Sequence, residues 1–193
     1  MQQAMKPEQS LGAAFAGTSL RYDNTSITLH WITAALVILL WCAGETIDWF
    51  PSRDARIAAR SLHILFGVLL GAILCWRIWW RTGGAGQRLP AVDSRALNAL
   101  AKSVHVALYV ILVTTVVLGI ANAWVRGDSI FGLFSIPSIA PGNKALRGQV
   151  EDLHSWSANT LVILAGLHAL AGLWHHFVRK DGVLRRMWPA RTP

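Results

Sequence analysis

The sequence predicts an all-α integral membrane protein built as a four-helix bundle, and three observations support this. Of its 193 residues, 53% are hydrophobic and only 15% are charged, whereas a soluble domain usually has about 25% charged residues. Ten tryptophans are present, and many lie near the ends of apolar runs, where amphipathic rings mark a bilayer interface. Four segments are long enough to cross a hydrocarbon core, which requires roughly 20 helical residues.

The predicted helices run from Ile27 to Trp49, from Ser61 to Trp80, from Ser103 to Trp124 and from Leu153 to Val178. Residues 83–97 contain Gly, Pro and Arg, and residues 125–150 contain Gly, Ser and several turn signals, so both are predicted connectors. The helices form one domain over residues 21–189. Residues 1–20 lack the basic-then-apolar order of a signal peptide. We expect them to be a flexible cytoplasmic tail, with 190–193 as a short C-terminal tail.

Basic residues are divided unequally between the two sides of the predicted bundle. The side with both termini and the connector 83–97 carries twelve Lys or Arg residues against four acids, and the other side carries six of each. Because cytoplasmic segments of membrane proteins are rich in Lys and Arg, both termini are predicted to be cytoplasmic. Membrane topology thus accounts for the net charge of +8, and no solvated basic element indicates nucleic-acid binding.

Histidines fall at matching depths on different predicted helices. His30 and His168 lie toward the cytoplasmic side on the first and fourth helices, and His63 and His154 lie toward the outer side on the second and fourth. Fourteen residues separate the two histidines of the fourth helix, which is about 21 Å and nearly four turns, so they share one face. Two opposed imidazoles at one depth can supply both axial ligands of a haem iron. The pattern therefore predicts two haems held between helices, with these four histidines as the iron ligands.

A structural role is the alternative for each histidine, and it is favoured for His105, near the cytoplasmic start of the third helix, and for His176. A zinc site would need three or four ligands clustered with Cys or carboxylates, and two imidazoles at each depth do not form such a cluster. Glycines near the candidate ligands either admit a flat macrocycle or serve ordinary close helix packing. They are Gly67, Gly71, Gly166 and Gly172.

Several motifs carry a resemblance to a known family. "RYDNTSITLHW" opens the first helix, "SLHILFG" the second, "SVHVALYVIL" the third and "LHSWSANT" the fourth, and "GLHALAGLWHHF" with "LRRMWP" follows. In order and spacing these motifs resemble the bacterial dihaem cytochrome b561 proteins, small four-helix electron carriers of the inner membrane. The resemblance covers residues 21–189.

The resemblance implies that His30 and His168 hold a haem b on the cytoplasmic side and that His63 and His154 hold another on the periplasmic side. It also implies an oxidoreductase of the bacterial inner membrane that oxidises superoxide at the periplasmic side and passes the electrons to ubiquinone. His175 lies where the family is thought to bind the quinone, and an imidazole there could supply protons. An interfacial histidine held by lipid headgroups is the alternative for His175.

Charge alone does not identify the electron donor. Superoxide is an anion, and a basic funnel would raise its association rate. Arg56, Arg60 and Arg147 are the candidates for attracting it, although the outer side has no net charge and acids lie among these arginines. Two other functions stay open: an electron-transfer subunit serving a partner dehydrogenase or a soluble cytochrome, and a small membrane protein that senses or carries a metal.

Overall fold

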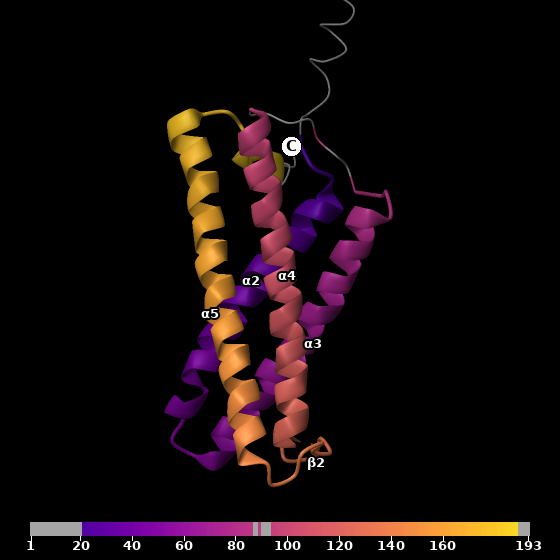
Figure 1. The fold of residues 1–193 in the computed structure, drawn as a ribbon, viewed down its shortest axis with the longest axis vertical. Helices are drawn as coiled ribbons and strands as arrows, with labels where there is room; N and C mark the ends of the chain where they lie inside the picture. Colours follow the sequence, from indigo (N-terminus) through magenta and orange to yellow (C-terminus); the bar gives the residue numbers. More distant parts are fainter. Residues whose placement is uncertain (1–20, 87–88, 90–93, 189–193) are drawn as a thin grey trace, which may run out of the picture.

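Four long helices make up the structure, a computed structural model that describes residues 21–86, 89 and 94–188. They run alternately up and down the long axis (Figure 1), and each is long and apolar enough to cross a membrane. The prediction of an all-α, four-helix membrane bundle is therefore confirmed. The two expected tails, 1–20 and 190–193, lie outside the described residues. The helices are α2 (Asn24–Thr46), α3 (Arg53–Thr82), α4 (Arg95–Arg126) and α5 (Lys144–Trp174).

The helices extend beyond the apolar spans that the sequence predicts. α3, α4 and α5 begin eight or nine residues earlier than expected. Ser52, Ser94 and Asn143 cap them, and each side-chain oxygen accepts a hydrogen bond from the backbone N–H three residues on. Such a cap satisfies one of the unpaired N–H groups at a helix start. The predicted connectors were consequently wrong for residues 95–97, 125–126 and 144–150, which are helical.

A short hairpin closes one end of the bundle, which we call the outer end. The hydroxyl of Ser61 is fully buried and accepts a hydrogen bond of 2.8 Å from the backbone N–H of Phe131. This bond ties the hairpin to α3, two residues before His63. The hairpin pairs two antiparallel strands, β1 (Ser129–Ile130) and β2 (Phe134–Ser135).

The opposite end, which we call the inner end, is closed by the segment after α5. Trp31 donates from Nε1 to the carbonyl of Met187 at 2.8 Å, and the N–H of Tyr22 donates to the carbonyl of Arg186 at 3.0 Å. The C-terminal segment therefore lies against the start of α2. It consists of a π-helical turn, η2 (His175–Arg179), and a 3-10 turn, η3 (Leu184–Met187).

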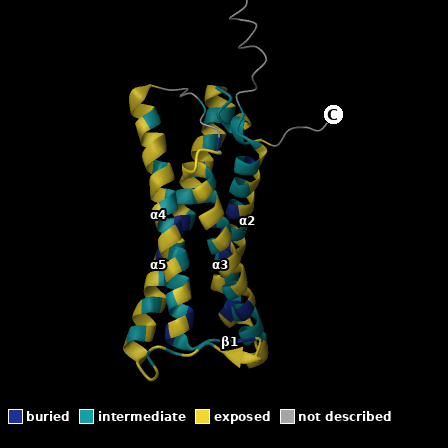
Figure 2. Ribbon diagram, turned by 90° about the vertical axis from the view of Figure 1, so that its right-hand side faces the viewer, coloured by how far each residue is buried: buried dark blue, intermediate teal, exposed yellow. Residues whose placement is uncertain are grey.

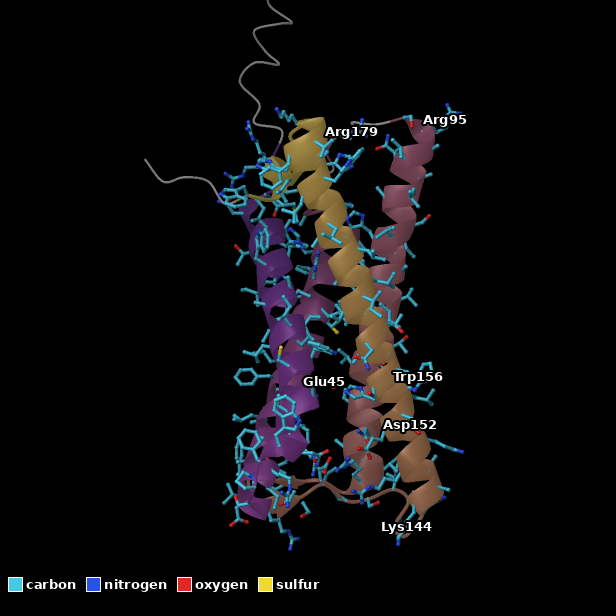
Figure 3. The ribbon with its side chains drawn as sticks, turned by 90° about the vertical axis from the view of Figure 1, so that its left-hand side faces the viewer. Glu45, Arg95, Lys144, Asp152, Trp156 and Arg179 are labelled. Atoms are coloured by element: carbon cyan, nitrogen blue, oxygen red, sulfur yellow. The ribbon has the colours of Figure 1, made fainter. Side chains whose placement is uncertain are left out.

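The helices associate most closely in two pairs, α2 with α3 and α4 with α5. Many large apolar residues are exposed, and exposed residues, drawn in yellow, occur along all four long helices (Figure 2). Lipid tails are as apolar as a protein core, so such a surface suits a bundle embedded in a membrane. Charged side chains lie at both ends, with Arg95 and Arg179 at the inner end and Lys144 at the outer end (Figure 3). The buried core lies near the middle of the helices and comprises Val37, Leu40, Leu70, Leu74, Leu112 and Leu161.

Candidate functional site

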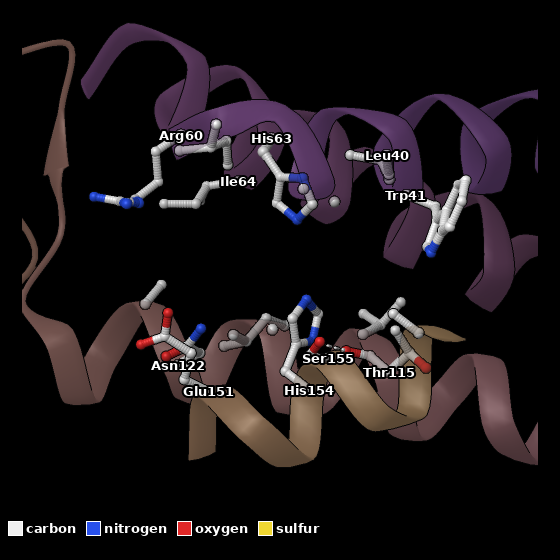
Figure 4. Close-up of a pocket in the computed structure, with 18 of the residues that line it drawn as sticks. Leu40, Trp41, Arg60, His63, Ile64, Thr115, Asn122, Glu151, His154 and Ser155 are labelled. Carbon is white, nitrogen blue, oxygen red and sulfur yellow. Dashed lines mark hydrogen bonds between the residues drawn. The ribbon is translucent and has the colours of Figure 1, made fainter. Parts of the chain in front are cut away.

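His63 of α3 and His154 of α5 face each other across a pocket in the outer half of the bundle (Figure 4). Their ring centroids are 6.2 Å apart and the ring planes are nearly perpendicular, at 87°. Nδ1 of His154 donates a hydrogen bond of 3.1 Å to the carbonyl of Thr115, so the lone pair of the neutral ring lies on Nε2. Nδ1 of His63 is buried. A ring nitrogen of each histidine points toward the other ring (Figure 4).

The spacing of this outer pair fits one iron atom between two imidazoles. An imidazole nitrogen lies about 1.2 Å from its ring centre and a metal–imidazole bond is about 2.0 Å long, so two opposed ligands have centroids about 6.4 Å apart. The observed separation is 6.2 Å. The two side chains could therefore hold a haem iron as a pair of axial ligands.

Glycines give the outer pair its space. A Cβ atom built on Gly44 would lie 3.4 Å from Cε1 of His63, and one built on Gly119 would lie 3.0 Å from Cε1 of His154. Gly67 lines the pocket and faces open space. All four long helices contribute to this pocket, whose volume of about 420 Å³ is in the range of cofactor sites.

The four glycines near the candidate ligands divide into two kinds. A Cβ on Gly71 would lie 3.1 Å from Cγ1 of Val116, and one on Gly172 would lie 3.7 Å from Cδ1 of Leu184. These two therefore serve close packing. Cβ atoms on Gly67 and Gly166 would meet nothing within 4 Å, so the surroundings of these two leave room for a flat group.

Three histidines gather toward the inner end. His30 of α2 and His168 of α5 have ring centroids 6.3 Å apart, almost the separation of the outer pair. His105 of α4 lies closer to His168, at 5.1 Å, which is too short for a metal atom between two opposed imidazoles. Nδ1 of His105 donates to the carbonyl of Ala101 at 2.7 Å. His30 and His168 are thus the inner pair that could hold an iron, and His105 packs against it.

Arg77 of α3 also belongs to this inner cluster. Its Nη2 lies 3.0 Å from Nδ1 of His30, and its guanidinium lies over the ring of Tyr109 at 5.3 Å from the centroid. A charged side chain within a membrane span is costly and usually faces a functional interior. Sequence reasoning counted Arg77 only toward the charge asymmetry. Its position inside the apolar run "CWRIWW" was the signal that could have identified it.

Ion pairs lie on the outer side of the pocket. Arg126 contacts Glu151 at 3.0 Å and Asp128 at 3.4 Å, and Arg60 lies 4.0 Å from Asp128. Burial raises the pKa of Asp128, although Arg126 and Arg60 act in the opposite direction. Both arginines are largely covered, whereas four carboxylates that line the pocket are exposed. We call these four the carboxylate rim: Glu45, Asp48, Glu151 and Asp152.

The three arginines that the sequence suggested for attracting an anion do not come together. Arg60 lines the pocket beside Arg126. Arg56 donates from Nη1 to the carbonyl of Phe50 at 2.7 Å and lies outside the pocket lining, and Arg147 is exposed in the first turn of α5. Arg60 is therefore the one of the three with direct access to the pocket.

His175 lies at the inner end, where α5 gives way to the π-helical turn. Its Nδ1 donates to Oδ2 of Asp181 at 2.6 Å, and Nε of Arg179 lies 3.6 Å from the same oxygen. Desolvation is the largest single influence and raises the pKa of Asp181, but the hydrogen bonds from His175 and from the N–H of Val183, together with the nearby Arg179, outweigh it, so the pKa is lowered. His176 packs edge-on against Phe177.

Within residues 21–86, 89 and 94–188, no three His, Cys, Asp or Glu side chains are grouped so that they could hold a metal ion by themselves. The described part of the chain thus offers pairs of imidazoles and not the larger clusters that structural zinc sites use. Paired imidazoles suit a metal whose other ligands come from a macrocycle.

Residues 21–190 match the family model of the prokaryotic cytochrome b561 proteins, and the chain belongs to this family. It is a multi-pass protein of the bacterial inner membrane that binds haem b and transfers electrons. The chain is similar to cytochrome b561 homolog 1 of Escherichia coli K12, with 29% identity over 89% of this chain and 98% of that protein. Cytochrome b561 homolog 2 of the same organism is 31% identical over 90% of this chain and 94% of its own length. A Yersinia pestis protein named probable superoxide oxidase CybB is 30% identical over 89% of this chain and 97% of its length.

Proposed function

We propose that this chain is a transmembrane dihaem electron carrier, with His63 and His154 as the axial ligands of one haem b and His30 and His168 as those of a second. The observation that carries this proposal is the spacing of both pairs, 6.2 and 6.3 Å between ring centroids. Haem bound at each pair supplies reversible one-electron chemistry. Because α5 contributes one ligand to each pair, one continuous helix links the two sites.

The chain's other groups orient these ligands and exclude water. The carbonyl of Thr115 accepts the Nδ1 proton of His154, which leaves Nε2 free to bind iron. Between the two pairs lies the apolar core with Leu112 and Leu161. Polar groups and ions are costly to bury in such apolar surroundings, so the core excludes water. An electron can therefore cross without an accompanying leak of protons.

We assign the outer end to the periplasm and both termini to the cytoplasm. The support is the concentration of Lys and Arg on the side of the termini. In this orientation the pair His63 and His154 is reached from the periplasm, and the pair His30 and His168 lies toward the cytoplasm. Residues 21–189 form the membrane domain, with 1–20 and 190–193 as tails.

Superoxide is the proposed donor at the outer pair, and the name of the Yersinia pestis relative supports it. Each superoxide ion that gives up one electron leaves as dioxygen. Two superoxide ions therefore supply the two electrons that, with two protons, convert one ubiquinone to ubiquinol. Arg60 lines the pocket three residues before His63 and is the proposed attracting residue, with Arg56 and Arg147 acting at longer range.

A basic redox protein is the second candidate donor, and the carboxylate rim favours it. Exposed carboxylates repel an anion, whereas they attract a positively charged protein surface and speed its docking. The partner would be a soluble cytochrome or a dehydrogenase with a basic face. In that case the chain works as the membrane subunit that receives electrons from this partner.

Ubiquinone is the proposed acceptor at the inner end, near His175. Nδ1 of His175 donates to Asp181, so Nε2 is the atom left to exchange a proton with a quinone oxygen. A general acid must lie within hydrogen-bond reach of the atom that it protonates. The Asp181 carboxylate would orient the ring for this transfer.

Spectroscopy of the purified protein tests the haem assignment. We expect a reduced-minus-oxidised spectrum with the α-band of b-type haem and two haems for each chain. His168→Ala should lose one haem and retain the other, because it removes one ligand of the inner pair only. Loss of neither haem in this variant would show that the pairing is wrong.

Stopped-flow measurements distinguish the two donors. If superoxide is the donor, Arg60→Glu should slow haem reduction by superoxide severalfold, since electrostatic steering changes association rates by roughly tenfold or more. Arg185→Glu is the matched control, because Arg185 is exposed at the inner end. If superoxide reduces the protein no faster than its own dismutation allows, superoxide is excluded. Co-purification of a stoichiometric soluble redox protein would then support the second candidate.

A further inference from the structure

We propose that Arg77 gives the inner pair the higher reduction potential, so that electrons pass from His63 and His154 to His30 and His168. This inference rests on the proposed dihaem function and deepens it, because it names the residue whose charge sets the order of the two reduction potentials. It assigns Arg77 a role as a positioning charge that acts on the redox site without itself reacting.

The positive charge of Arg77 lies at the inner pair without a carboxylate to neutralise it. Its guanidinium contacts His30 and Tyr109, and no ion pair to Arg77 is formed among the described residues. Asp23, near the start of α2, is engaged by Ser26 and Trp80. The inner site therefore carries an excess positive charge.

The outer pair has the opposite surroundings. Two arginines line its pocket, and both are paired with acids. Five carboxylates line the same pocket: Glu45, Asp48, Asp128, Glu151 and Asp152. The electrostatic potential at the outer pair is consequently neutral to negative.

A fixed positive charge stabilises the reduced form of a nearby redox group, because that form carries one more electron, and a negative charge destabilises it. Such interactions are stronger inside a protein, where the effective dielectric constant is about 20, than in water, where it is about 80. Salt screens them poorly when they are buried. The same haem at both sites contributes the same charge, so the difference in potential comes from the chain.

Iron ligation leaves this charge in place. A neutral imidazole that binds iron through Nε2 keeps its proton on Nδ1, and a protonated Nδ1 cannot accept a hydrogen bond from a guanidinium. Arg77 therefore loses its acceptor on His30 when that histidine becomes a ligand. The face of Tyr109 is its second contact, and a cation–π contact of this kind holds the guanidinium in the inner cluster.

Two single-site variants allow each potential to be measured alone. His63→Ala should retain only the inner haem, and His168→Ala only the outer haem. Equilibrium potentiometric titration, followed at the haem absorption band, then gives one midpoint for each protein. At a common potential, we expect the ratio of reduced to oxidised haem to be at least tenfold higher at the inner site than at the outer site. This tenfold ratio corresponds to a midpoint difference of 59 mV for a one-electron couple. Equal midpoints, or the reverse order, would overturn the proposal.

Arg77 itself is tested in the His63→Ala protein. Arg77→Gln should lower the inner midpoint, and the shift should persist at high salt. Arg77→Lys should keep the midpoint, because it keeps the charge. Arg81→Gln is the matched control, since Arg81 is an exposed arginine one turn further along α3. An unchanged midpoint in Arg77→Gln, or an equal shift in Arg81→Gln, contradicts the role of Arg77.

Haem content is measured on every variant, and it distinguishes a failure of the proposed dihaem function from a failure of the role proposed for Arg77. If Arg77→Gln loses its haem, the midpoints of the two single-site variants and of Arg77→Lys still decide the outcome. Absence of haem from the unmodified protein would contradict the proposed function. Two haems in the wrong order of potential would contradict only the role of Arg77.

Discussion

Gly119 of α4 lies so close to His154 of α5 that a Cβ atom on the glycine would be 3.0 Å from Cε1 of the imidazole. A side chain at this position would push the ring out of line with His63. Overpacking costs about 1–3 kcal/mol, which lowers an affinity about 5- to 150-fold. We therefore expect Gly119→Val to lose most of the outer haem and to retain about half of the total haem, as measured by pigment extraction.

Gly148→Val is the matched control, because a Cβ there would meet nothing within 4 Å. Gly148 lies in the first turns of α5, outside the pocket lining. An equal loss of haem in both variants would show that the close approach of Gly119 does not matter.

Combined histidine variants test which imidazoles share an iron. His63→Ala and His154→Ala each remove a ligand of the same proposed haem, so the double variant should lose no more haem than either single variant. The pair His63→Ala with His168→Ala should lose both haems. Residues that act on one site are non-additive, whereas separate sites add. The haem-to-protein ratio of each purified variant gives the answer, and a full loss in the first double variant would break the pairing.

His105 is expected to pack against a ligand and not to be one. Its ring lies 5.1 Å from that of His168 in an edge-on arrangement, and a phenyl ring can keep such a contact. His105→Phe should therefore retain both haems, as measured by the area of the haem absorption band. His168→Phe should lose one. A loss in His105→Phe as large as that in His168→Phe would identify His105 as a ligand.

The contact of His175 with Asp181 predicts a pH-dependent inner end. The pKa of Asp181 is lowered below its ordinary value, so this carboxyl stabilises the folded segment above its unfolded pKa, and the stabilisation is lost as the pH falls through the folded pKa. Hydrogen–deuterium exchange of residues 175–187 should show protection at neutral pH that falls in acid. Asp181→Asn should lower the protection already at neutral pH. The same protection and the same pH dependence in this variant would contradict a stabilising role for the contact.

Hydropathy predicted four helices but not their full lengths. The apolar spans end where side chains stop facing lipid, and the polar first turns of α3, α4 and α5 lie beyond that limit. Ser52, Ser94 and Asn143 carried the missing information, since side chains of these types cap helix starts. Capping bonds identify a helix start even when hydropathy does not.

The histidine pairs were predictable because depth follows from a constant rise per residue. The counting matched His30 with His168 and His63 with His154, and the structure brings the members of each pair together. Their role as iron ligands stays a proposal. Counting does not give the rotation of one helix against another, so it did not reveal that His105 contacts His168.

The charge network of the outer pocket was beyond the reach of sequence patterns. It depends on the connector after α4, where Gly127 adopts a left-handed backbone conformation with a φ of 67°. This turn leads into the hairpin and leaves Asp128 beside Arg126 and Arg60. Such a path has no periodicity, and it is set by tertiary contacts such as the bond from Phe131 to Ser61.

α5 carries His154 and His168 on one uninterrupted run of backbone hydrogen bonds. The distance between the two imidazoles is therefore set by the pitch of a helix and not by loops or by the tilt of neighbouring helices. Electron tunnelling slows steeply with distance, and in the proposed dihaem function a tilt of the whole bundle leaves the spacing of these two ligands, one from each haem site, unaltered. One inserted residue between the two would turn one imidazole by about 100° relative to the other. The number of residues between His154 and His168 thus sets the spacing and the alignment of the two α5 ligands in the proposed dihaem function.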